Sequence, residues 1–439
     1  MKKKFILPFA LVALFCSIGL FYNPIMPASD GVASASDIAW MLTASGLVML
    51  MTPGLSFFYG GMVSKKNIIS TMLQSFIALG VITLLYVVVG FSLCFGDSFY
   101  GIIGNPFTFF MFKDVGLATH AGISPTIPLL LFALFQLKFA IITPALITGS
   151  FAERVKFNAY LVFICLFSLC IYTPLAHWTW HPEGFLRKWG VLDFAGGTVV
   201  HMSAGYAALA GAIILGKRAS HSKGASHDPA NIPFVMLGTG MLWFGWFGFN
   251  AGSSLAANDT AILAFATTVV ASAAAMMSWI FFDALRGKKV SAMGACIGAV
   301  VGLVAITPGA GFVTLPHALF IGFVSAMISN LAVGAKNKSN LDDTLDVFPC
   351  HGVGGIVGMI LTGVFAKDVG LYYGHTETFL YHLLALVIVS AYTFGGSYLL
   401  YKITEKIVPL RVSKQEEIDG LDFTQHGEVY KLKRPEITN

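Results

Sequence analysis

Two histidines stand in stretches that are otherwise apolar. His201 lies in DFAGGTVVHMSAG (residues 193–205), and His351 lies in DVFPCHGVGG (residues 346–355). An ionisable side chain inside a membrane costs several kcal/mol, about 2.5 or more for the charged types, so it marks a functional site by default. The alternative is that each is a neutral core histidine whose ring nitrogens are satisfied by neighbouring groups.

The residues around the two histidines exclude most kinds of chemistry. A metal site needs three or four ligands, and no third His, Cys or carboxylate has suitable spacing. The segment from His201 to Gly205 lacks the first glycine of a GxSxG elbow, and HExxH, P-loop and dinucleotide fingerprints are absent. We therefore expect no catalytic residues, no metal and no cofactor. Two neutral imidazoles that share one hydrogen suit the passage of a small polar molecule, or of a proton near neutral pH, through a narrow apolar pore.

An aspartate opens each of the two expected helices, Asp193 ahead of His201 and Asp346 ahead of His351. Carboxylates at such positions accept hydrogen bonds from the free N–H groups of the first turn. We therefore interpret both aspartates as structural N-caps. The alternative for Asp193 is that it lends negative potential to a nearby cation site.

The composition is that of an integral membrane protein. Of the 439 residues, 56% are hydrophobic and 11% are charged, whereas soluble domains carry about 25% charged residues. The net charge of +5 does not indicate nucleic-acid binding, because the basic residues cluster at loop ends. Six cysteines without a CxxC pair predict neither a disulfide framework nor a zinc site.

The N-terminus has a basic start and an apolar run from Phe5 to Tyr22, followed by the small residues Ala33-Ser34-Ala35. This pattern predicts a cleaved signal peptide over residues 1–35. An uncleaved additional helix is the alternative.

Apolar windows of about 20 residues predict an all-α protein with eleven membrane spans. The long unbroken runs do not have the period of two that a barrel would show. The expected spans are 37–60, 68–93, 126–150, 158–178, 194–216, 232–252, 260–283, 290–307, 312–334, 347–366 and 377–402.

Lysine and arginine orient these spans, because cytoplasmic loops carry an excess of them. The N-terminus of the mature chain is then outside and the C-terminal tail cytoplasmic, in the cytoplasmic (inner) membrane. One set of loops holds Lys65, Lys66, Arg154, Lys156, Lys217, Arg218, Lys223, Arg286, Lys288, Lys289, Lys336 and Lys338, and the opposite set holds Lys113, Arg187, Lys188 and Lys367.

Eleven helices with ends on opposite sides favour two five-helix repeats, inverted in the membrane, plus one long C-terminal helix. The repeats would span about 37–217 and 231–367 of a membrane domain over 36–403, with the last helix at 377–403. SFFYGGMVSKKN (56–67) faintly echoes GFNAGSSLAAN (248–258). Helices 5 and 10 carry His201 and His351, so inversion would bring the two side chains together. The alternative is that they are unrelated packing residues.

Several motifs resemble the ammonium transporter (Amt/Mep/Rh) family, bacterial Amt type, from about Asp37 to Tyr430. They are MTPGLSFFYGGMVSKKN, ALITGSFAERVKF, DFAGGTVVH with GYAALAGA behind it, GWFGFNAGS, DVFPCHGVGGIVG and GLDFTQHGE. The resemblance implies a homotrimer of eleven-helix protomers in the lipid bilayer, each with its own pore for ammonium or ammonia. An ammonium sensor of the same fold is the alternative function. A membrane enzyme is the third reading, and the absent motifs oppose it.

The resemblance also implies roles for single residues. Trp180 and Ser253 match an outer recruitment site, where cation–π attraction is worth about 2 kcal/mol. Phe139 and Phe249 match a pair that closes the pore, although phenylalanine in a membrane helix is usually packing. His201 and His351 match the twin histidines of the conducting path.

Lys138 departs from the family pattern, since it stands beside Phe139 in an otherwise apolar helix. One residue turns a helix by about 100°, so Lys138 need not face the pore. We expect it to snorkel or to pair at a protomer contact. The alternative is a positive charge that alters cation entry.

Residues 404–439 form the expected cytoplasmic regulatory tail. GLDFTQHGE resembles a family segment that packs under the neighbouring protomer, and its charges could pair with Lys217, Arg218 and Lys336. The resemblance implies docking of a trimeric PII-type signalling protein on this face. We expect residues 431–439 to be disordered.

Overall fold

The computed structural model describes residues 6–22, 25–222 and 228–430. Parts of three expectations lie outside the described residues. They are residues 1–5 and 23–24 of the expected signal peptide, Lys223 of the basic loops, and the last segment of the tail, 431–439.

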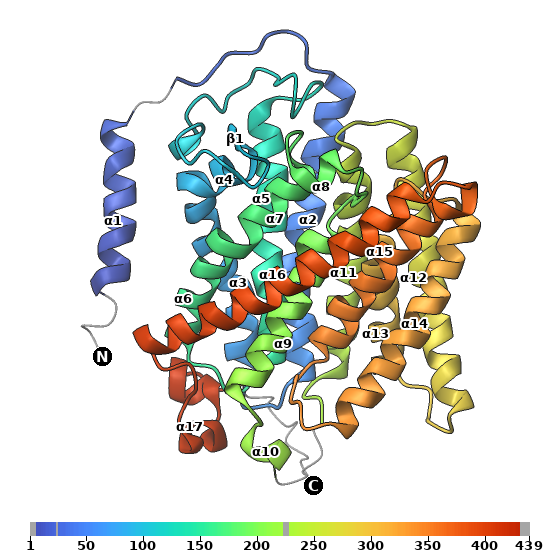
Figure 1. Cartoon of the computed structure of the whole chain (residues 1–439). Helices are drawn as coiled ribbons and strands as arrows, with labels where there is room; N and C mark the ends of the chain where they lie inside the picture. The colour runs from blue at the N-terminus through green and yellow to red at the C-terminus, as the bar shows by residue number, and fades with distance from the viewer. Residues whose placement is uncertain (1–5, 23–24, 223–227, 431–439) are drawn as a thin grey trace, which may run out of the picture.

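Long apolar helices form a single bundle (Figure 1). Its first half contains α2 (Ala35–Met62), α3 (Ile68–Leu85), α4 (Phe91–Phe95), α5 (Leu129–Ile147), α6 (Phe157–Phe167), α7 (Thr173–Trp180) and α9 (Ser203–Leu215). Its second half contains α11 (Ile232–Ala251), α12 (Asp259–Leu285), α13 (Ala292–Ile306), α14 (Leu315–Lys338), α15 (Gly354–Phe365) and α16 (Glu377–Ile407). The remaining elements are α1 (Ile6–Phe21), α8 (Phe185–Lys188), α10 (Ala219–Ser222), α17 (Lys414–Asp419) and the hairpin β1 (Ser98–Phe99) with β2 (Ile103–Gly104).

Side-chain caps set where several membrane helices begin. Ser34, Asn231, Asn258 and Ser291 each accept a hydrogen bond from the backbone N–H three residues on, at the starts of α2, α11, α12 and α13. Within each helix the backbone then satisfies its own polar groups, as a membrane requires. Polar caps at the ends and apolar residues between them explain why these segments are helices.

Ten helical stretches in the described residues are long and apolar enough to cross a membrane. The expected span at 290–307 is instead α13, a helix of 15 residues. At 1.5 Å per residue it is roughly 22 Å long, short of the about 30 Å of a hydrocarbon core. Glycines let α13 pack closely against α12, since a Cβ on Gly298 would lie 2.6 Å from Trp279 Cβ, and one on Gly302 would lie 2.6 Å from the carbonyl of Ala271.

Helices α9 and α15 are each preceded by a π-helical turn. These turns are η6 (Gly197–Met202), which carries His201, and η8 (Phe348–Val353), which carries His351. Gly205 of α9 crosses η8 so closely that a Cβ there would lie 2.3 Å from Gly352 Cα. This glycine contact brings the two histidine-bearing turns side by side in the middle of the bundle.

The last helix, α16, slants across one side of the bundle in Figure 1 and braces both halves. Tyr401 of α16 stacks on Phe163 of α6, with ring centroids 3.8 Å apart. His382 accepts a hydrogen bond from the Leu192 N–H (2.9 Å) and contacts the Met359 carbonyl (2.8 Å). α16 therefore connects α6, the segment before η6, and α15.

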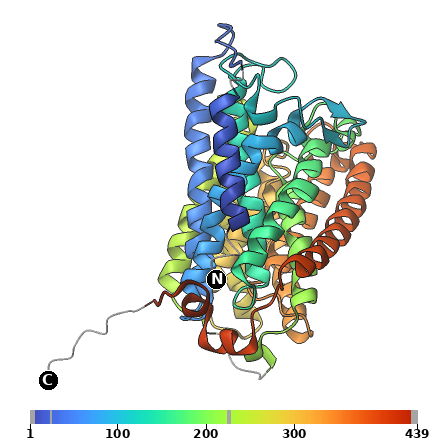
Figure 2. The same cartoon turned by 90° about the vertical axis from the view of Figure 1, so that its left-hand side faces the viewer.

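The two ends of the bundle differ in chemistry. We call the end that carries β1 and β2 the hairpin end, and the end under which α17 lies the tail end (Figures 1 and 2). At the tail end Arg218 pairs with Glu153 (2.9 Å) and with Asp342 (3.0 Å), and all three side chains are buried. Burial alone would raise the pKa of Asp342, but the Arg218 hydrogen bond and the nearby Arg154 charge lower that pKa to about 2.

The tail packs on its own chain. The Asp422 carboxylate accepts hydrogen bonds from the N–H groups of Ile69 (3.0 Å) and Ser70 (2.7 Å), and so caps α3. Lys66 Nζ donates to the carbonyls of Glu417 and Ile418. The tail is therefore fixed to the loop between α2 and α3.

The three basic residues that were expected to pair with the tail have partners in other segments of their own chain. Lys217 Nζ donates to Asn340 (2.7 Å), and Lys336 pairs with Asp346 (2.6 Å). Arg218 pairs with carboxylates of the loops, as described above. Lys217 and Arg218 therefore connect the segment after α9 to other loops at the tail end, and their pairing with the tail of a neighbouring protomer stays a prediction.

Candidate conduction site

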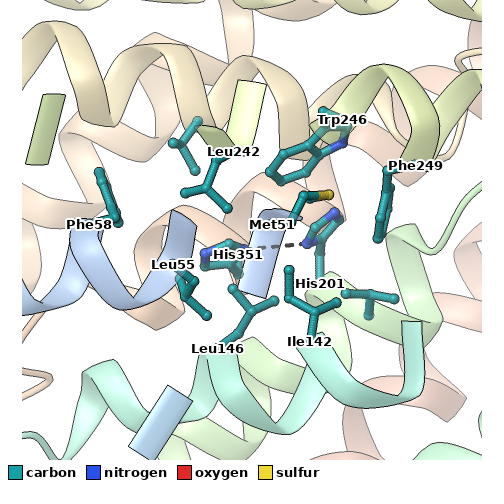
Figure 3. A pocket seen from close by; sticks show the side chains of 12 residues that line it. Met51, Leu55, Phe58, Ile142, Leu146, His201, Leu242, Trp246, Phe249 and His351 are labelled. Carbon is teal, nitrogen blue, oxygen red and sulfur yellow. Dashed lines mark hydrogen bonds between the residues drawn. The ribbon is translucent and has the colours of Figure 1, made fainter. Parts of the chain in front are cut away.

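The two histidines lie against each other in the middle of the bundle (Figure 3). His201 Nδ1 and His351 Nδ1 are 3.3 Å apart, and both residues are buried. One of these nitrogens must carry the hydrogen and the other must accept it. In the described part of the chain His201 Nε2 has no hydrogen-bond partner. The pair can therefore share one hydrogen and keep further nitrogen atoms available.

A narrow apolar cavity surrounds the pair. Its volume is about 10 Å³, close to the lower limit for holding one water molecule. The indole of Trp246 stacks on the imidazole of His201, with centroids 5.4 Å apart and planes at 19°. The other lining residues are Met51, Leu55, Phe58, Ile142, Leu146, Val200, Leu242, Phe249 and Val300. Nothing larger than a very small molecule fits beside the imidazoles.

Stacked aromatic rings close one side of this cavity. Phe139 of α5 and Phe249 of α11 stack with centroids 4.2 Å apart and planes at 28°. Phe249 is 6.1 Å from the His201 ring, and Phe139 is 5.7 Å from Trp180. Trp180, Phe139, Phe249 and His201 therefore follow one another in space.

A larger cavity, which we call the vestibule, lies beyond the phenylalanine pair and has a volume of about 520 Å³. Trp180, Ser253, Phe139 and Asp193 all line it. Trp180 Nε1 donates to the Asp193 carbonyl (3.0 Å), which fixes the indole plane and leaves the ring faces for other contacts. Ser253 Oγ donates to the Phe249 carbonyl (2.8 Å), so its lone pairs are directed elsewhere and can accept.

Comparison with known proteins decides the family. Residues 39–431 match the Ammonium Transporter Family. The chain belongs to this family. An ammonium transporter of Aquifex aeolicus is 46% identical over 409 residues, which cover 91% of this chain and 94% of that protein. One of Bacillus subtilis is 42% identical over 400 residues, which cover 89% of this chain and 97% of that protein.

Solved structures of family members have the same fold. Mep2 of Saccharomyces cerevisiae has a TM-score of 0.83 at 33% identity, over 89% of this chain and 93% of that one. A structure described as a sensor Amt protein has a TM-score of 0.82 at 30% identity, over 89% of this chain and 98% of that one. With ten spans of sufficient length, this family member is a multi-pass membrane protein.

Asp193 binds the turn that carries His201. Its carboxylate accepts hydrogen bonds from the N–H groups of Gly196 (2.8 Å), Gly197 (2.6 Å) and Thr198 (2.7 Å), and from the Thr198 hydroxyl (2.5 Å). Gly196 has φ +118°, a conformation that glycine adopts without strain. Asp193 therefore fixes the start of η6 in this family member.

The expectation for Asp346 was wrong. Asp346 adopts φ +57° and pairs with Lys336, whereas Asp343 accepts the N–H of Phe348 (2.7 Å) at the start of η8. Asp343 is eight residues ahead of His351, as Asp193 is eight ahead of His201. Equal spacing was the signal that could have identified Asp343. Burial and the nearby Asp346 charge raise the pKa of Asp343 to about 6.

Lys138 lines neither the histidine cavity nor the vestibule. It is half-buried and lies one turn after Leu134, which is 37% exposed. A helix turns about 100° per residue, so the side chains of Lys138 and Phe139 point in different directions.

The sequence analysis did not identify Trp246, because an aromatic residue in an apolar helix has the appearance of ordinary packing.

Proposed function

We propose that this family member moves ammonium or ammonia across the cytoplasmic membrane, from the vestibule past Phe139 and Phe249 to the histidine pair. The observation that carries the proposal is the imidazole pair inside a cavity of about 10 Å³ behind stacked phenylalanines. A hydrated cation does not fit this cavity, whereas a single small molecule that can exchange hydrogen bonds with imidazole does. Relatives named ammonium transporter support the same function.

Transport can be measured on proteoliposomes that receive an ammonium concentration jump, with a potassium jump as the control. We expect an ammonium-dependent current or uptake and no response to potassium.

The second candidate function is that of an ammonium sensor, which a structural relative described as a sensor Amt protein favours. A sensor would bind ammonium without sustained flux, so absent flux with intact binding would decide for it.

The proposed roles follow the order of the side chains in space. Trp180 and Ser253 recruit the cation in the vestibule, Phe139 and Phe249 close the entrance, and His201 with His351 conducts. Asp193 and Asp343 support the two histidine-bearing turns by fixing their first N–H groups. None of these roles involves a reacting covalent bond, so we propose no enzymatic activity.

The architecture that we propose has eleven spans, with α13 as the short one, in two inverted repeats followed by α16. Matched π-helical turns and matched aspartates eight residues before each histidine support the repeats. The excess of basic residues supports a cytoplasmic tail end and an outer hairpin end. Residues 1–35 are the proposed signal peptide, 36–403 the membrane domain and 404–439 the tail.

Replacing Trp180 with leucine tests the recruitment role. Leucine removes the aromatic face, so the half-saturating ammonium concentration should rise by up to about tenfold, equivalent to about 1.4 kcal/mol. Trp180→Phe, which keeps a π face, is the matched control and should change the value less. An unchanged half-saturating concentration in Trp180→Leu would place the recruitment site elsewhere.

Cutting the chain after Val412 tests the role of the tail. We propose that the assembly is a homotrimer and that its tail end binds a PII-type signalling protein. The cut removes the Asp422 cap on α3 and the Arg411–Glu417 ion pair (2.9 Å), so transport should decrease while membrane insertion persists. Asp422→Asn, which weakens the cap alone, should give a smaller decrease. Full transport with an unaltered response to a PII protein would contradict this role.

A further inference from the structure

A chain of buried polar groups runs behind Trp246. Trp246 Nε1 donates to Thr307 Oγ1 (2.9 Å), Thr307 Oγ1 lies 3.3 Å from Asn250 Oδ1, and Asn250 Nδ2 donates to Thr268 Oγ1 (2.9 Å). Trp246 is 2% exposed and the other three residues are fully buried. The chain joins α11, α12 and the end of α13.

The direction of these hydrogen bonds follows from the donors available. An indole N–H only donates, so Thr307 accepts from it. The Thr307 hydroxyl hydrogen then has the Leu303 carbonyl (2.8 Å) or Asn250 Oδ1 as its acceptor. Thr268 in turn donates to the Ala264 carbonyl (2.6 Å). Every member has a partner, and a satisfied buried network holds its members in one arrangement.

The position of the Trp246 indole matters for His201. The indole stacks on the His201 imidazole and also lies 5.4 Å from the Phe249 ring. A buried indole N–H requires an acceptor, and without Thr307 it would have to turn to another one. His201 Nε2 is a neighbouring ring nitrogen with no partner in the described residues, and it accepts whenever Nδ1 carries the shared hydrogen.

We propose that Thr307 and Asn250 are positioning residues that hold Trp246 flat over His201 and keep His201 Nε2 available to the passing molecule. The inference rests on the proposed function and adds residues that touch neither cavity. Thr307 and Asn250 should therefore affect the maximal flux through the histidine cavity and not the recruitment of ammonium, because recruitment takes place at Trp180 and Ser253 beyond the phenylalanine pair.

The test compares Thr307→Val with Thr307→Ser in ammonium-jump recordings on proteoliposomes. Valine keeps the shape and removes the hydroxyl, so maximal flux should fall about tenfold at an unchanged half-saturating concentration. Serine keeps the hydroxyl and should transport like the wild type. Thr404→Val is the matched control, because Thr404 is fully buried in α16 and, among the described residues, its hydroxyl bonds the Leu400 carbonyl of its own helix.

A double-mutant cycle with Trp246→Phe separates positioning from general stability. Phenylalanine has no N–H, so Thr307→Val should cause no further loss of flux in that background. A merely structural role predicts the same proportional loss in both backgrounds, and that result would overturn the proposal. Wild-type flux in Thr307→Val would overturn it as well.

Thr268→Val provides a second variant if Thr307→Val does not fold. It breaks the same chain two members further from the indole, and flux should fall about threefold, again only when Trp246 is present. Flux equal to the wild type in this variant would also contradict the proposal. An absence of ammonium-specific flux in the wild type would instead contradict the proposed transport function itself. Failure of the positioning role and failure of the transport function therefore give different results.

Discussion

Replacing both His201 and His351 with alanine is expected to abolish selective ammonium transport. The two imidazoles supply the hydrogen-bonding groups that face each other in the cavity, at 3.3 Å between their Nδ1 atoms. Without them a molecule that has left water finds only apolar walls, and leaving polar groups unpaired there costs several kcal/mol. Each single alanine variant should already lose flux or discrimination against potassium. Current after ammonium and potassium jumps is the measurement.

His317→Ala is the matched control for these variants. His317 stacks on Phe365, with centroids 4.4 Å apart, and lines neither cavity. Its loss should leave flux unchanged. Size-exclusion chromatography of the double-alanine variant should show the wild-type assembly. Wild-type flux and selectivity in the double-alanine variant would refute the pair as the conducting site.

Arg218→Met is expected to destabilise the protein by about 3–5 kcal/mol, the usual cost of leaving buried charges without their partner. Arg218 neutralises two buried carboxylates, Glu153 and Asp342, that come from opposite halves of the chain. Its loss should therefore loosen the tail end as a whole. Thermal unfolding in detergent measures the effect.

Lys217→Met provides the comparison for Arg218→Met. Lys217 is the adjacent residue, and its exposed hydrogen bond to Asn340 (2.7 Å) should contribute within about 0.5 kcal/mol. The interpretation fails if both variants unfold at the same temperature as the wild type. Arg218→Met leaves the Glu153 and Asp342 carboxylates buried without this partner. Asp342→Asn in the Arg218→Met background removes one of the two charges, so it should recover part of the lost stability.

The sequence was sufficient to predict most of the membrane helices, because apolar length is a strong signal. The apolar window at 290–307 overestimated the length of this helix. Ser291 accepts the Gly294 N–H (3.0 Å) and so caps the start of α13. A hydropathy window averages across such a cap and cannot detect it. The short helix is tolerated where glycines bring it deep against α12.

Only part of the candidate site could be predicted from the sequence. The histidines could be paired because they occupy equivalent helices, and the structure brings them together. The sequence analysis assigned the helix cap to Asp346 and did not consider Asp343, whose carboxylate accepts the Phe348 N–H in the structure. Trp246 and Thr307 have no distinctive spacing. Their importance comes from contacts between helices that no single stretch of sequence records.

The closed stack of Phe139 on Phe249 also has an electrical consequence for a cell that makes this protein. A potential of 100 mV stores about 2.3 kcal/mol for each elementary charge held across the membrane. A pore open to potassium would discharge that energy continuously, whether or not any nitrogen source was present. Rings with centroids 4.2 Å apart leave no space for water between them, so the proposed gate would pass no hydrated potassium ion in this arrangement. With the proposed gate closed in this way, we expect the protein to remain in an energised membrane without discharging it.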